Sequence, residues 1–187
     1  MINILGIAGS LRKESLNKKA LNAARLLVPQ DATLEVFEHL AEIPPFNQDL
    51  EQSLPDIVIQ FKKQIKGADA ILFVTPEYNY SVPGVLKNAI DWASRPYGDS
   101  AWEGKPAAIM SASPGMLGGA RAQYHLRQIM VFLNMFPLNR PEVLIPSAHD
   151  KFDDKCNLID EHTKEKITEL LKALDDWTIQ GQFSKMK

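Results

Sequence analysis

The sequence predicts an α/β fold in which five parallel strands form a sheet covered by helices on both faces. Short apolar runs alternate along the chain with longer segments whose apolar residues recur at helical spacing. The run at residues 70–74, AILFV, is apolar throughout, as expected for a strand covered on both faces. Strands that alternate with helices run parallel, because right-handed crossovers return each strand in the same direction.

Each element of the first half of the chain has a local cause. The first strand is apolar until a Gly-Ser pair, and the first helix opens with Ser-Leu-Asn and ends before a proline. The second strand alternates apolar and polar residues. A Pro-containing connection leads to a helix that begins at proline, which suits a first turn, and ends at glycine. These elements and the third strand are predicted at residues 2–8, 15–28, 32–37, 55–67 and 70–74.

The second half repeats this alternation. A proline opens the third helix, which carries one apolar stripe. The fourth strand runs into a loop rich in serine and glycine, and a long amphipathic helix follows. After a short fifth strand and a polar loop, a last apolar stripe indicates a C-terminal helix. These elements are predicted at residues 83–94, 106–110, 118–135, 142–145 and 167–177.

Five strands in this rhythm predict the flavodoxin-like order 2-1-3-4-5, a three-layer, doubly wound sandwich. In such a sheet, ligands bind outside the carboxyl ends of the strands, near the switch between the first and third strands. Loops of unusual composition follow the first, third and fourth strands. We therefore expect these three loops to converge on one crevice.

Composition bounds the possible functions. A chain of 187 residues with 45% hydrophobic residues is expected to form a single domain over residues 1–187. The formal net charge of −2 argues against a nucleic-acid partner, which requires a strongly basic face. The N-terminal apolar run is too short to span a membrane and has no basic segment before it, and the four histidines lack the spacing of a metal site. Cys156 is the only cysteine, which favours a reducing, cytoplasmic setting.

The loop after the first strand combines hydroxyls, backbone N–H groups and a cation at the beginning of a helix. Such a helix end binds phosphate, because its N–H groups are unpaired and its dipole favours an anion. The loop matches neither the Walker A pattern nor the G-x-G-x-x-G pattern of dinucleotide sites. The alternative is an ordinary capping turn in which Arg12 and Lys13 are solvated.

The other two loops suit a flat ligand with polar edges. In the loop after the third strand, Tyr78 or Tyr80 could stack on a ring while Asn79 meets its edge. Glu77 is harder to assign, and its alternative role is a carboxylate near a helix start. Glycines in the loop at residues 113–119 permit close backbone approach to a ligand, the alternative being a flexible turn.

Together these stretches resemble a known family. GSLRxxSxN, PEYNxSxPGxLKNAIDWxSR and SPGxxGGxRA, after the first, third and fourth strands, are similar to the NADPH-dependent FMN reductase family, which includes quinone, azo-dye and chromate reductases. The resemblance covers residues 2–142. It implies an FMN phosphate surrounded by Ser10, Arg12, Ser15, Leu16 and Asn17, and an isoalloxazine ring held by Pro76, Glu77, Tyr78, Asn79, Ser113 and Gly115.

The resemblance also implies the reaction. It predicts an FMN-dependent oxidoreductase that transfers hydride from NADPH or NADH through FMN to a small acceptor, such as a quinone, azo compound, chromate or flavin, by a ping-pong mechanism. FMN carries the chemistry, so no catalytic side chain is expected; Tyr80 and Gly118 would face the substrate. The resemblance further implies a homodimer or homotetramer, with contacts through the helices at residues 83–94 and 118–135.

Two other functions remain open at this point. A flavodoxin-type FMN electron carrier without a nicotinamide step would share the fold, so the fold alone cannot decide. The Ser-Leu-Arg loop and the nearly balanced charge count against it. The second alternative is an FMN-free scaffold or regulatory protein on the same fold.

Overall fold

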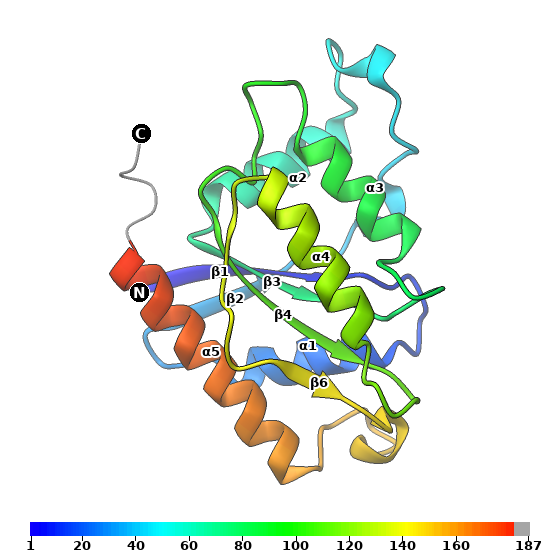
Figure 1. Cartoon of the computed structure of the whole chain (residues 1–187), viewed down its shortest axis with the longest axis vertical. Helices are drawn as coiled ribbons and strands as arrows, with labels where there is room; N and C mark the ends of the chain where they lie inside the picture. Colours follow the sequence, from blue (N-terminus) through cyan, green and yellow to red (C-terminus); the bar gives the residue numbers. More distant parts are fainter. Residues whose placement is uncertain (182–187) are drawn as a thin grey trace.

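A parallel sheet forms the centre of the computed structural model, which describes residues 1–181 (Figure 1). The order β2-β1-β3-β4-β5 confirms the predicted 2-1-3-4-5, and a sixth strand, β6, also pairs with β4. The predicted domain extends to Lys187, and its residues 182–187 lie outside the described part. The strands are β1 (Ile2–Ala8), β2 (Ala32–Val36), β3 (Ala70–Val74), β4 (Pro106–Ala112), β5 (Phe136–Pro137) and β6 (Val143–Ile145).

The sheet edge beside β4 is divided between two strands. β5 pairs with Pro106 and Ala107 at the beginning of β4, and β6 pairs with its end. The predicted fifth strand at residues 142–145 is β6, so the prediction of five strands missed β5, a two-residue strand that contains a proline. β4 also extends two residues beyond its predicted end, because β6 pairs with Ser111 and Ala112. The buried Ser111 hydroxyl accepts a hydrogen bond from Nε2 of Gln123 at 2.8 Å and needs no water.

Helices cover both faces of the sheet (Figure 1). α1 and α5 pack on one face, and α2, α3 and α4 pack on the other. The predicted helix at residues 118–135 is shorter than expected, because Gly118 and Gly119 have positive φ values and the chain leaves the helix after Phe132. The helices are α1 (Leu16–Leu27), α2 (Asp56–Gly67), α3 (Gly84–Ala93), α4 (Ala120–Phe132) and α5 (Glu161–Gly181), with short 3-10 helices at Leu40–Glu42, Gln48–Leu50 and Ala148–Lys151.

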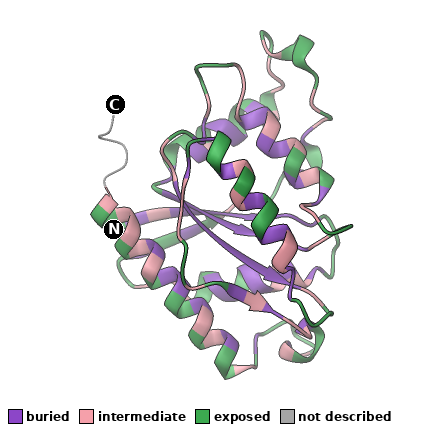
Figure 2. Ribbon diagram, in the orientation of Figure 1, coloured by how far each residue is buried: buried purple, intermediate pink, exposed green. Residues whose placement is uncertain are grey.

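Double coverage explains the continuously apolar strands. In β3, Ile71 and Phe73 pack with α2, α3 and α4, whereas Leu72 and Val74 pack with α1 and α5. All five residues of β3 are buried, and Figure 2 shows the central strands as the most buried part of the fold. None of the helices described in residues 1–181 has the length and apolar character needed to cross a membrane.

Asp160 precedes α5 and gives the fold a pH-dependent contact. Its carboxylate accepts hydrogen bonds from Nζ of Lys151 at 2.8 Å and from the backbone N–H of Thr163 at 2.9 Å. The hydrogen bond from Lys151, followed by those from Thr163, lowers the pKa of Asp160 from its ordinary 3.8 to about 2. Because the folded pKa is the lower one, this contact stabilises the fold above pH 3.8, and the contribution is lost as the pH falls to about 2.

Asp160→Asn should therefore destabilise the protein at pH 7 and much less at pH 2.5. Urea unfolding of both proteins at the two pH values measures the difference. An equal loss at both values would contradict the assigned role of the carboxylate charge.

Candidate functional site

The carboxyl ends of β1, β3 and β4 lie side by side, and the loops that follow them meet there (Figure 1). The N–H of Gly9, directly after β1, donates to the carbonyl of Val74 at the end of β3 at 2.8 Å. A Cβ at Gly9 would lie 2.8 Å from Oγ1 of Thr75, so this approach requires glycine. The N–H of Thr75 in turn donates to the carbonyl of Met110 in β4 at 3.1 Å. The structure confirms the predicted convergence of the three loops.

The loop between β1 and α1 presents unpaired donors at the beginning of a helix. Ser15 is the N-cap of α1, and its hydroxyl accepts the backbone N–H three residues later at 3.3 Å. The buried Ser10 hydroxyl accepts the N–H of Arg12 at 3.4 Å. Within residues 1–181, the N–H groups of Leu16 and Asn17 and the exposed guanidinium of Arg12 have no hydrogen-bond partner. These groups fit an anion such as a phosphate.

The side chain of Asn17 connects two of the elements that form the site. Its Nδ2 donates to the carbonyl of Ala112 at 2.9 Å, and its Oδ1 accepts the N–H of Ala112 at 2.9 Å. Asn17 is 2% exposed, so both bonds are shielded from water. The amide thus ties the beginning of α1 to the end of β4 and leaves only the backbone N–H of Asn17 for a ligand.

The loop after β3 contains a tight two-residue turn. Tyr78 and Ser81 exchange two backbone hydrogen bonds of 3.0 Å each, and between them Asn79 and Tyr80 have φ values of 50° and 64°. Positive φ at both central positions is typical of a type I′ turn, and it costs a residue with a side chain about 1–2 kcal/mol. Residues Tyr78 and Tyr80 are 46% and 63% exposed, so both can contact a flat ligand.

Glu77 joins this turn to α4. Its Oε2 accepts the backbone N–H groups of Arg121 at 3.0 Å and Ala122 at 3.4 Å, and its Oε1 accepts Nε of Arg121 at 2.6 Å. Cζ of Arg121 lies 3.7 Å from the centre of the Tyr80 ring, a stacked cation–π arrangement. The alternative considered from the sequence, a carboxylate near a helix start, therefore describes Glu77, although the helix is α4 and not the adjacent α3.

Two residues of this arrangement were not among the predicted site residues. They are Arg121 and His125, one turn apart on α4. Nδ1 of His125 lies 2.9 Å from Oγ of Ser81, which gives the turn a second contact with this helix. Arg121 is the arginine of the SPGxxGGxRA pattern, so the sequence did contain a signal for it. His125 carried no such signal.

The third loop, residues 113–119, is partly closed by its own contacts. Oγ of Ser113 accepts the N–H of Gly115 at 3.0 Å, and both residues stay accessible. Gly118, predicted to face the substrate, is buried: its carbonyl accepts the Ser111 hydroxyl at 2.6 Å, and a Cβ there would lie 3.0 Å from the backbone nitrogen of Ile145. The exposed part of this loop is therefore residues 114–117.

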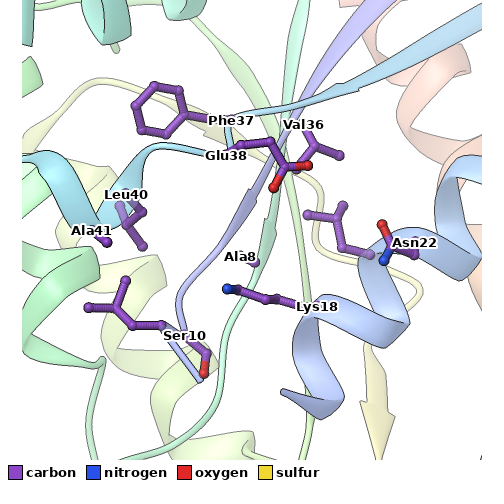
Figure 3. Close-up of a pocket in the computed structure, with 11 residues that line it drawn as sticks. Ala8, Ser10, Lys18, Asn22, Val36, Phe37, Glu38, Leu40 and Ala41 are labelled. Atoms are coloured by element: carbon purple, nitrogen blue, oxygen red, sulfur yellow. The ribbon is translucent and has the colours of Figure 1, made fainter. Parts of the chain in front are cut away.

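A small cavity of about 110 Å³ adjoins the first loop on the β2 side (Figure 3). Ser10 lines it from the loop after β1 and Lys18 lines it from α1, and Phe37, Glu38 and Leu40 close it beyond the end of β2. In Figure 3 the amine of Lys18 extends into the cavity toward Ser10. Ser10 therefore contributes to both the candidate phosphate loop and this cavity.

Comparison with known proteins agrees with this geometry. The model of the NADPH-dependent FMN reductase family matches residues 2–150. NAD(P)H-dependent FMN reductase PA1204 of Pseudomonas aeruginosa is 52% identical over 94% of this chain and 95% of its own length. A 2-hydroxy-1,4-benzoquinone reductase of Burkholderia sp is 40% identical over 94% of this chain and 96% of its own length.

A solved structure shows the same fold. The flavoenzyme NAD(P)H:(acceptor) oxidoreductase FerB from Paracoccus denitrificans has a TM-score of 0.89 and 36% identity, covering 96% of this chain and 98% of its own. The names of these relatives favour a reductase over the flavodoxin-type electron carrier and confirm the predicted enzyme class. This chain belongs to the NADPH-dependent FMN reductase family and is an FMN-dependent oxidoreductase that uses NAD(P)H.

Proposed function

We propose that this chain reduces quinones with NAD(P)H, using one FMN held where the three loops converge. Two features at the carboxyl ends of the strands carry this proposal. Unpaired donors lie at the beginning of α1, and two exposed tyrosines lie in the loop after β3. The unpaired donors suit a phosphate, and the rings suit a flat heterocycle. FMN has both parts. Residues 1–187 would act as one FMN-binding domain.

The phosphate would be held by the first loop. Arg12 supplies a charge-assisted hydrogen bond, and the N–H groups of Leu16 and Asn17 supply two further donors. Ser10 and Ser15 keep the loop in this shape through their own hydrogen bonds. The protein thus offers the phosphate a cation and a helix end together.

The ring would be held by the second and third loops. Residues 76–79 would hold it on one side, and Ser113 and Gly115 would line its other edge. Bound FMN supplies the two-electron exchange between NAD(P)H and the acceptor. Both oxygens of Glu77 already accept N–H groups, so its proposed role is structural and not proton transfer. Tyr80 shapes the open face where the acceptor binds, and Gly118 supports that face from behind.

Quinones are the proposed acceptors because a flat ring fits an open face bordered by Tyr78 and Tyr80, and because several relatives are named quinone reductases. The two substrates would use that face in turn, which gives a ping-pong mechanism. We propose a cytoplasmic location on the basis of the single cysteine, Cys156, which is free and exposed.

Steady-state kinetics test this function. With NADPH and NADH each varied against a benzoquinone, an azo dye, chromate and free FMN, we expect parallel double-reciprocal plots and a kcat/KM for the quinone at least tenfold above that for chromate. Intersecting plots would contradict alternating use of one face. A bound flavin that NADPH does not reduce, or a purified chain that takes up no FMN, would overturn the proposal.

A homodimer or homotetramer would form through α3 and α4. Val131 and Phe132 at the end of α4 are each 79% exposed, which is unusual for two neighbouring apolar side chains. Between the two helices lies a groove of about 410 Å³, lined by apolar residues that include Phe46, Ile129 and Phe132 and by the polar residues Lys87, Asp91, Ser94 and Arg95. A second copy of the chain would cover this surface.

Phe132→Asp should convert the assembly to a species of 20.9 kDa, because a carboxylate at the centre of an apolar contact loses its hydration. Sedimentation velocity measures this. Leu26→Asp is the matched control, since Leu26 is 84% exposed but lies on α1, and its assembly should be unchanged. Equal dissociation of both variants, or of neither, would contradict the proposed interface.

A further inference from the structure

Glu77 supplies the cap that α4 lacks. The N-cap residue of α4 is Gly119, which has no side chain to accept a hydrogen bond. The N–H groups of Arg121 and Ala122 belong to the first turn, where a helix leaves its donors unpaired, and Oε2 of Glu77 accepts both. A residue of the β3–α3 loop thus caps a helix that begins after β4. The turn and the helix end cannot shift independently.

The same contact balances two charges beside the candidate ring site. The side chain of Glu77 is only 10% exposed, whereas that of Arg121 is 42% exposed. With the positive end of the α4 dipole also directed at it, the carboxylate is well compensated. Losing one member of the pair would leave one net charge in a partly dehydrated place, where charges act more strongly than in water.

Resting on the proposed function, we infer that Glu77 and Arg121 are positioning residues that hold residues 76–81 against α4 and set the reduction potential of the bound FMN. Tyr80 is part of the same arrangement, because its ring lies against the guanidinium of Arg121 and its left-handed backbone needs external support. The pair acts through shape and charge and does not react.

The two charges predict the direction in which each variant shifts the reduction potential of bound FMN. Reduction adds negative charge to a flavin, so an extra negative charge nearby disfavours the reduced form. The removal of a nearby negative charge favours the reduced form. Arg121→Met leaves Glu77 uncompensated and should lower the potential. Glu77→Gln leaves Arg121 uncompensated and should raise it. The double variant restores neutrality and should return near the wild-type value.

The experiment compares FMN affinity with potential in each reconstituted variant. Fluorescence titration gives the dissociation constant of oxidised FMN, and anaerobic titration against redox dyes gives the midpoint potential. Each single variant should change the ratio of the dissociation constants of oxidised and reduced FMN at least tenfold, in opposite directions; tenfold corresponds to about 30 mV for a two-electron couple. The double variant should lie within threefold of wild type.

Two controls separate charge from structure. Arg121→Lys keeps the charge and should leave the ratio of the dissociation constants of oxidised and reduced FMN within threefold of wild type. If Glu77→Gln does not fold, the comparison of Arg121→Met with Arg121→Lys still tests the effect of the charge. Glu161→Gln with Lys164→Met removes an ion pair of 2.7 Å on α5, an element that contributes nothing to the three loops, and should change nothing.

Two outcomes would overturn the inference. One is a change of the potential in the same direction in both single variants. The other is weaker FMN binding at unchanged potential, which would show a purely structural role. Failure of the wild-type chain to bind FMN would instead overturn the proposed function.

Discussion

Replacing Asn17 with alanine should lower the free energy of unfolding by about 3 kcal/mol, the largest effect on stability that we expect from one polar side chain here. The amide bonds both the N–H and the carbonyl of Ala112 in a place that water does not reach. Leaving two buried backbone groups unpaired costs about 1–3 kcal/mol each. For a chain of this size the loss lowers Tm by roughly 6–12 °C, measurable by calorimetry.

The matched control is Asn22→Ala. Asn22 lies on the same helix with an exposed side chain, and alanine is the better helix former there, so its stability should stay equal or rise slightly. If Asn17→Ala and Asn22→Ala have the same Tm, the amide does not tie α1 to β4.

Arg12→Ala should raise the FMN dissociation constant about tenfold or more, because a charge-assisted hydrogen bond to phosphate contributes about 1.5–3 kcal/mol. The guanidinium is exposed and pairs with no group in the described part of the chain, so its removal leaves the fold intact. Fluorescence titration of the apoprotein with FMN measures the constant. Unchanged affinity would place the phosphate elsewhere.

Lys13→Ala separates a specific contact from general electrostatics. Lys13 is the next residue, it is equally exposed, and its loss changes the net charge by the same amount. We expect at most a twofold change for this variant. Equal weakening by both variants would show that the loop attracts FMN only through its overall charge.

Most of the fold could be predicted because its central strands, β1, β3 and β4, are buried on both faces, which leaves a continuous apolar signal in the sequence. β3 is the clearest case, with the predicted and observed bounds identical. β5 has no such signal: it is two residues long, and it is a strand only because β4 lies beside it. The early end predicted for β4 has a similar cause, since the hydroxyl of Ser111 is paired by groups outside its own strand, the carbonyl of Gly118 and the amide of Gln123.

The convergence of the three loops could be predicted from the sequence, but the contacts between them could not. Local patterns showed that the three loops were unusual, and the parallel sheet brought them together. The bond from Asn17 to Ala112 spans 95 residues, and that from Glu77 to Arg121 spans 44. The left-handed turn at Asn79 and Tyr80 could not be predicted from the sequence either, because tyrosine rarely adopts that conformation unless other contacts hold it.

The divided strand beside β4 has a consequence for the behaviour of the protein at high concentration. An exposed, continuous strand edge is a template on which another chain can add a strand and begin a fibril. Here the outer strand is interrupted between β5 and β6, and Pro137 in β5 has no N–H to donate. That edge of the sheet is therefore protected against aggregation through strand addition.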